Sequence, residues 1–172
     1  VGATRAEVDA VAREYWSSGI RHIVALRGDP PEGQGKYAPH PGGYAFAADL
    51  VGGLTKIAPF ELSVAAYPET HPEARSAQAD LDNLKRKIDA GATRAIAQFF
   101  FDNRHYFEFL DRARKVGINV PIVPGILPVT NFAQVVKFAT KCGVSIPGSL
   151  ADAFEGLRSE EHTSELQSLA YL

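Results

Sequence analysis

Two patterns of hydrophobic and polar residues alternate along the chain. Four short runs rich in β-branched and aromatic residues are typical of buried strands: residues 21–28, 60–67, 94–101 and 120–126. Apolar residues at helical spacing predict five helices: residues 4–19, 44–57, 72–91, 103–117 and 131–143. The first of these has Thr4 three residues before Glu7, the spacing of a capping box. The chain is therefore predicted to repeat a strand and a helix four times, after one leading helix.

The strands are apolar on both faces, which predicts parallel strands covered by helices. Both an open doubly wound sheet and part of a (β/α)8 barrel have this pattern, and the pattern alone does not choose between them. A complete TIM barrel needs eight strand–helix units and about 250 residues. If the fold is a barrel, these 172 residues hold about four units, a partial barrel.

Composition narrows the class of partner. With 45% hydrophobic residues and a net charge of −2, the chain suits a single core, and 18 basic against 20 acidic residues give no reason to expect nucleic acid or an anionic membrane. Cys142 is the only cysteine, and the five histidines show no metal-ligand spacing, so no metal is expected. No apolar run approaches the roughly 20 residues of a membrane span. We expect a cytoplasmic protein that binds small molecules.

Two segments depart from the repeat. The connection after the first strand, "GDPPEGQGKYAPHPGGY", is long and rich in Gly and Pro, which is typical of functional or disordered loops. From Arg158 onward, "RSEEHTSELQSLAYL" has neither period and looks like translated sequencing-adapter read-through; the alternative is a natural polar tail. We therefore predict an α/β domain at residues 1–157 and a non-native tail at residues 158–172.

Polar residues interrupt or follow each apolar strand, where active sites lie in parallel α/β folds. They are Arg27, Gly28 and Asp29 after the first strand, Tyr67, Pro68, Glu69 and His71 after the second, Gln98 within the third, and Pro124 and Gly125 in the fourth. An amide inside an apolar strand needs hydrogen-bond partners. Gln98 therefore either contacts a heterocyclic ligand or is satisfied by neighbouring backbone.

One predicted helix carries a polar stripe. Asp80, Asn83 and Lys87 are spaced i, i+3 and i+7 and share a face, and Arg86 lies beside them. Such a stripe can bind ribityl hydroxyls and phosphates, or it can be a solvated helix face. The residues alone leave both interpretations open.

Four segments in register resemble methylenetetrahydrofolate reductase: "HIVALRGDPP", "ELSVAAYPETHPEA", "DLDNLKRKIDAGATRAIAQFFFDN" and "PIVPGILPVTNFAQVVKFA". The resemblance covers residues 4–157. It implies an FAD-containing (β/α)8 barrel that reduces 5,10-methylenetetrahydrofolate to 5-methyltetrahydrofolate with NADH or NADPH, both substrates using one site in turn. It also implies that the first three strands and the last strand are missing, so the chain alone is expected to be inactive; a homo-oligomer of the complete protein is left open.

The resemblance assigns the site residues by matching motif. Those implied to bind FAD are Arg27, Gly28, Asp29, Ala47, Tyr67, His71, Ala74, Asp80, Asn83, Arg86 and Lys87. Those implied to bind the folate are Gln98, Gln134 and Phe138, and Gln98 would also contact the nicotinamide. Asp29 is the implied catalytic residue, because a carboxylate stabilises the 5-iminium cation of the opened folate. The alternative is a flavin-free binding or interaction module in which the strand-end residues only stabilise loops.

Overall fold

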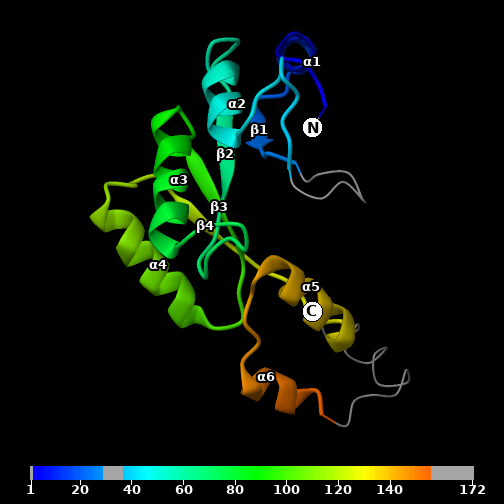
Figure 1. Ribbon diagram of the computed structural model, residues 1–172, viewed down its shortest axis with the longest axis vertical. Coiled ribbons are helices and arrows are strands. Elements are labelled where there is room, and N and C mark those ends of the chain that lie inside the picture. The colour runs from blue at the N-terminus through cyan, green and yellow to red at the C-terminus, as the bar shows by residue number, and fades with distance from the viewer. Residues whose placement is uncertain (1, 29–36, 156–172) are drawn as a thin grey trace.

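The computed structural model describes residues 2–28 and 37–155, and four parallel strands form its sheet (Figure 1). The strands pair in the order in which they occur: β1 (His22–Ala25), β2 (Glu61–Ala66), β3 (Arg94–Phe99) and β4 (Ile122–Gly125). The helices are α1 (Arg5–Ser17), α2 (Ala47–Leu54), α3 (Ala77–Asp89), α4 (Asn103–Lys115), α5 (Phe132–Cys142) and α6 (Gly148–Ala153). The predicted α/β fold of successive strand–helix units is confirmed, and sequential parallel pairing is the arrangement of neighbouring units in a (β/α)8 barrel.

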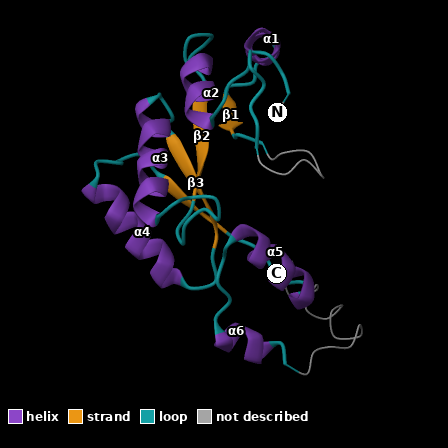
Figure 2. Cartoon of the chain, viewed as in Figure 1, coloured by secondary structure: helices purple, strands orange, loops and turns teal. Residues whose placement is uncertain are grey.

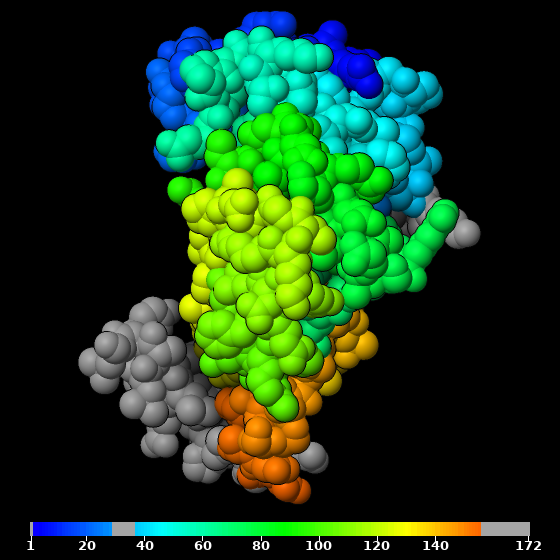
Figure 3. All heavy atoms as spheres, turned by 90° about the vertical axis from the view of Figure 1, so that its left-hand side faces the viewer, coloured from blue at the N-terminus to red at the C-terminus, as the bar shows by residue number. Residues whose placement is uncertain are grey.

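One face of the sheet packs against helices. Leu62 and Val64 of β2 are fully buried, and they belong to a core that includes Val51 of α2, Leu84 of α3 and Ala113 of α4. In Figure 2, α3 and α4 lie together on one side of the strands, and Figure 3 shows these two helices side by side on that surface. On the other face, alternate residues are open, since Val24 is 53% exposed and Val123 is 42% exposed. The sheet therefore has one packed face and a second face that is open at β1 and β4, while Ser63 of β2 is buried there.

The helix starts follow local side-chain chemistry. Thr4 caps α1 and exchanges hydrogen bonds with Glu7, so the predicted capping box is confirmed. The predicted helix over residues 72–91 begins only at Ala77, because Ser76 is extended and its hydroxyl caps the helix. Residues 67–76 are therefore a loop, which we call the β2–α3 loop.

The helix α6 was not predicted from the sequence. It has only six residues, begins with a glycine and contributes no buried residue, so its hydrophobic pattern is too short to detect. In Figure 1 it lies with α5 beyond the ends of β3 and β4. Within the described parts of the chain, no helix is long and apolar enough to cross a membrane.

Candidate functional site

The carboxyl ends of the parallel strands bring several of the predicted site residues together. Arg27 follows β1, the β2–α3 loop follows β2, and Gln98 is the penultimate residue of β3. The amino-terminal half of α3 contacts the β2–α3 loop, since Asp80 accepts a hydrogen bond from the backbone of His71. Strands that are parallel and adjacent place these residues at one edge of the sheet.

An ion pair joins β1 to the β2–α3 loop. Arg27 Nη1 lies 2.6 Å from Glu73 Oε2, and the same guanidinium lies 4.5 Å from the ring centroid of Tyr37. The hydrogen bond from Arg27 lowers the pKa of Glu73 below its usual value. Gly28, the next residue, has a φ of 69°, a left-handed conformation that suits glycine at the end of this strand.

His71 is held by three contacts within the same region. Its backbone N–H donates to Asp80 Oδ2 at 2.8 Å, and its Nδ1 accepts from the backbone N–H of Glu73 at 3.0 Å. Its ring meets that of Tyr67 edge to face, with centroids 4.5 Å apart. Since Nδ1 is an acceptor, a neutral His71 ring carries its proton on Nε2, where it can be donated to a ligand.

Lys87 is buried between α3 and β2. Lys87 is 6% exposed, and its Nζ donates to the carbonyl oxygen of Ala65 at 2.5 Å. Burial lowers the pKa of Lys87 to about 8, an effect that the carboxylate of Asp80 opposes. Both side chains border a cavity of about 10 Å³, room for one water molecule at most. The interpretation of this stripe as a solvated helix face is therefore wrong at Lys87.

The other residues implied to bind a cofactor lie on the same elements or beside them. Asn83 is half-buried on α3 and accepts from exposed Arg86 at 3.3 Å, while Ala74 donates its N–H to the carbonyl of His71. Ala47 is the first residue of α2. The position of Asp29, the implied catalytic residue, lies outside the described residues.

Gln98 lies beside an irregularity in the sheet. The register of β3 with β4 shifts between Ile96 and Phe99, and a Cβ on Gly125 would lie only 2.2 Å from the carbonyl oxygen of Ala97. The side-chain Oε1 of Gln98 accepts from the N–H of Phe99 at 3.0 Å. Neighbouring backbone thus satisfies the carbonyl end of the amide, while its NH₂ group has no partner among the described residues and can donate to a ligand.

The two folate-site residues predicted on α5 share one exposed face, since Gln134 and Phe138 are four residues apart. The ring of Phe138 stacks on Phe99, with centroids 5.4 Å apart, although Phe138 remains 47% exposed. This contact brings the helix to the carboxyl end of β3. The structure therefore places Phe138 against Phe99, the residue that follows Gln98, and Gln134 one helical turn away.

Sequence reasoning did not assign roles to Glu69 or Glu73. Glu73 pairs with Arg27, and Glu69 accepts from the backbone of Ser145 across 76 residues of sequence. Both lie in "YPETHPEA", directly after a predicted strand, but their distant partners were not visible in sequence. Among the described residues no group of three or more His, Cys, Asp or Glu is arranged to hold a metal ion.

Comparisons of sequence with known proteins agree on one family. The family model described as methylenetetrahydrofolate reductase matches residues 1–171. The 5,10-methylenetetrahydrofolate reductase of Salmonella typhimurium is 58% identical over 166 residues, which cover 96% of this chain and 54% of that protein. The Escherichia coli protein of the same name is 57% identical over the same shares. The Arabidopsis thaliana protein named methylenetetrahydrofolate reductase (NADH) 1 is 39% identical over 90% of this chain and 28% of its own.

The chain spans about half the length of the bacterial relatives it matches. Among solved structures, a Clostridium thermocellum protein described as binding two copies of 5-methyl-5,6,7,8-tetrahydrofolic acid has a TM-score of 0.58 at 18% identity, covering 99% of this chain and 58% of its own. A phosphonopyruvate hydrolase has a TM-score of 0.55 at 14% identity, covering 98% of this chain and 66% of its own. At these identities the likeness is one of fold.

Proposed function

This chain belongs to the methylenetetrahydrofolate reductase family, and from that premise we propose that it carries the FAD-binding and folate-binding part of an enzyme that reduces 5,10-methylenetetrahydrofolate. NADH or NADPH would supply the hydride. The observation that carries the proposal is the linked set Arg27, Glu73, His71 and Asp80, which joins three elements at one edge of the sheet. A cytoplasmic location and the non-native nature of residues 158–172 remain predictions.

The donors and acceptors at this edge fit FAD. Arg27 and Lys87 offer cationic N–H groups for phosphate, His71 Nε2 offers a neutral donor, and Asp80 and Asn83 offer oxygens for ribityl hydroxyls. Lys87 is 6% exposed and its cavity has room for one water at most, so its ammonium would have to turn away from the carbonyl of Ala65 to reach a phosphate. When bound, FAD supplies the redox chemistry by accepting a hydride from the nicotinamide and giving it to the folate.

The folate would bind against Gln98 and α5. The free NH₂ group of Gln98 can donate to a ring nitrogen or carbonyl, and the exposed face of Phe138 offers an apolar surface for a flat heterocycle. Nicotinamide carries a carboxamide that the same amide group can recognise. We propose that the two substrates use this one site in turn, a ping-pong order, as the resemblance to the family implies; an amide group that can serve both heterocycles supports it. The C. thermocellum protein, described as binding a reduced folate, shares the fold and supports a folate ligand.

Two preparations test the function. The first is the full 172-residue chain, and the second is a chimera in which this chain replaces the segment it matches in the E. coli reductase. We expect both to quench FAD fluorescence on titration, and only the chimera to turn over. If neither binds FAD while the parental E. coli enzyme does, the proposal fails and a flavin-free binding module becomes the better account.

A further inference from the structure

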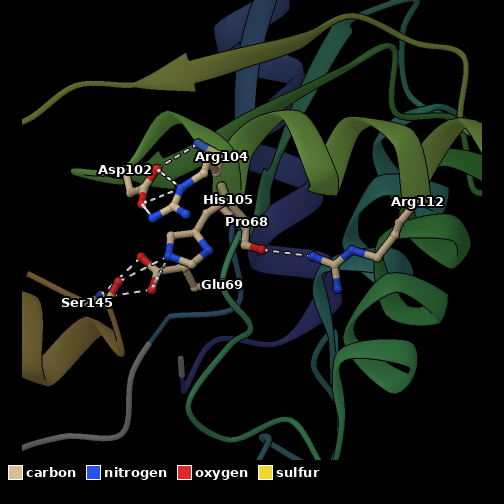
Figure 4. A network of polar contacts seen from close by, with 7 residues as sticks. All are labelled: Pro68, Glu69, Asp102, Arg104, His105, Arg112 and Ser145. Carbon is tan, nitrogen blue, oxygen red and sulfur yellow. Dashed lines mark hydrogen bonds and ion pairs between the residues drawn. The ribbon is translucent and has the colours of Figure 1, made fainter. Parts of the chain in front are cut away.

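A second polar network lies on the outer side of the β2–α3 loop, away from the residues proposed to bind flavin. The carboxylate of Glu69 accepts from the backbone N–H of Ser145, at 3.0 Å and 3.2 Å from its two oxygens, and it lies 3.7 Å from His105 Nε2 (Figure 4). The Glu69 side chain is only 14% exposed. We call Glu69, His105 and Ser145 the latch.

The latch has the residue types of a hydrolytic triad but not its geometry. Ser145 Oγ lies 3.3 Å from His105 Nε2, and Glu69 approaches the same nitrogen. A Ser–His–acid triad needs the serine and the acid on opposite nitrogens of the ring, so that the acid orients the base. His105 therefore cannot relay a proton from Ser145 toward Glu69, and acyl transfer is excluded as the use of these three residues.

What the latch joins is more informative. Glu69 belongs to the β2–α3 loop, His105 to the first turn of α4, and Ser145 to the segment between α5 and α6. Two further close approaches also connect the β2–α3 loop to α4 and to the end of α5. Arg112 of α4 donates to the carbonyl of Pro68 at 3.0 Å, as Figure 4 shows, and a Cβ at Gly143 would lie 2.9 Å from Pro72 Cγ. The outer side of the loop is thus held from α4 and from the end of α5.

The loop needs such support because its backbone is strained. Thr70 has a φ of 123°, an unfavourable conformation for a β-branched residue that persists only where the surroundings impose it. Thr70 lies directly between the latch residue Glu69 and His71. The inner side of the loop presents Tyr67, His71 and Glu73. His71 contacts Tyr67, Glu73 and Asp80, and Glu73 pairs with Arg27. One short loop therefore carries the latch on one side and the proposed flavin contacts on the other.

We propose that Glu69 is a positioning residue that fixes the β2–α3 loop in its flavin-binding conformation, by anchoring it to the backbone of the α5–α6 segment. This inference rests on the proposed function. The same anchor couples α5, with Gln134 and Phe138, to the flavin side of the site. In this proposal Glu69 acts through the loop and does not itself bind flavin or folate.

Three substitutions separate the parts of the latch. Glu69→Ala removes both acceptors, Glu69→Gln keeps one oxygen that can accept from Ser145 N–H, and Ser145→Ala keeps that N–H and removes only the hydroxyl. In the flavin-free chain, hydrogen exchange at the Ser145 amide and in residues 67–76 is expected to quicken about tenfold in Glu69→Ala, which is the typical effect of losing one charge-assisted hydrogen bond. Glu69→Gln is expected to restore most of the protection, and Ser145→Ala to match the unsubstituted chain.

Flavin titration of the same proteins tests the second half of the inference. We expect Glu69→Ala to bind FAD about tenfold more weakly, Glu69→Gln to recover most of the affinity, and the absorption band of any bound flavin to shift in Glu69→Ala alone. Ile118→Val, which removes one methyl group from a fully buried residue between α4 and β4, is the control for lowered stability and should keep the original affinity.

Unchanged exchange in Glu69→Ala would overturn the latch. Faster exchange with unchanged FAD affinity would overturn its role in flavin binding. If the unsubstituted chain and the chimera bind no FAD, the proposed function fails and the positioning role fails with it, while the exchange data still decide whether Glu69 fixes the loop.

Discussion

Arg27 Nη1 lies 2.6 Å from Glu73 Oε2, and this ion pair joins the end of β1 to the loop that follows β2. The two residues are 46 positions apart in the sequence. Both residues stand at the edge of the sheet where the cofactor is proposed to bind. The pair holds the guanidinium in a fixed direction, which is a requirement for binding a phosphate with two hydrogen bonds. Several consequences of this arrangement can be measured.

Glu73→Gln is expected to weaken FAD binding by about fivefold, because Arg27 loses the charge that orients it. Arg27→Lys should cost more, since an ammonium cannot offer two parallel donors. Titration by flavin fluorescence measures both. Equal affinities for all three proteins would contradict a role for the pair.

The helix α2 contains two adjacent glycines that make a matched pair for stability. A Cβ at Gly53 would lie 2.1 Å from the hydroxyl of Tyr44, which donates to Asp9, whereas a Cβ at Gly52 meets nothing within 4 Å. Gly53→Ala is expected to lower the free energy of unfolding by about 1–3 kcal/mol. Gly52→Ala should raise it by about 0.5–1 kcal/mol, the gain of alanine over glycine in a helix. Urea unfolding that gave both variants the same sign would contradict this packing.

Gly125→Ala tests the close approach of β4 to β3 beside Gln98. The added methyl group would collide with the backbone at Ala97 and Gln98, so β4 would have to move away from β3 at the register shift. We expect a loss of about 2–3 kcal/mol of stability and a larger loss of folate turnover than of FAD affinity in the chimera. Gly148→Ala, where a Cβ meets nothing within 4 Å, is the control for both measurements. A variant with normal folate turnover would show that Gln98 needs no such support.

Because of Lys87, the free energy of unfolding is expected to depend on pH in the alkaline range. Its pKa of about 8 in the folded chain lies below the usual 10.5, so the folded chain releases this proton first. The unfolded chain then binds more protons between these values, and the free energy of unfolding rises with pH across that window. Lys87→Met should remove the rise, stabilise the fold by about 1 kcal/mol near neutral pH, and weaken FAD binding. An unaltered pH dependence in Lys87→Met would contradict the burial of a charged ammonium.

Because of Asp102, the free energy of unfolding is expected to depend on pH in the acidic range. Hydrogen bonds from Arg104 hold the pKa of Asp102 at about 2, below its usual 3.8, and the same carboxylate caps α4. A lowered pKa stabilises the folded chain above 3.8, and that contribution is lost as the pH falls through about 2. The difference in unfolding midpoint between the unsubstituted chain and Asp102→Asn should therefore shrink on acidification across this window. A constant difference would contradict the ion pair.

Much of this fold could be predicted from local sequence. The strands around Leu62 and Ile96 and the capping box at Thr4 are visible in the pattern, because burial and capping depend on neighbouring residues. The stripe Asp80, Asn83 and Lys87 was also visible, but the burial of Lys87 was not. Burial of a cation depends on which strand the helix packs against, and that is a tertiary contact.

The contacts that organise the candidate site were the ones that local pattern could not give. Arg27 meets Glu73 only after β1 has paired with β2, and Glu69 meets Ser145 only after the later strands and α5 have been added. The unusual φ of Thr70 likewise has no signal in its side chain. Resemblance to a family supplied the residue roles, and the structure supplied the contacts that bring those residues together.

One measurement tests the central proposal most directly. The chimera, loaded with FAD under anaerobic conditions, is mixed first with NADH or NADPH and then with 5,10-methylenetetrahydrofolate while the flavin absorption is followed. We predict loss of the absorption with the nicotinamide and its return with the folate. A chimera that binds FAD but does not regain its absorption with the folate, under conditions where the E. coli parent does, would contradict the account.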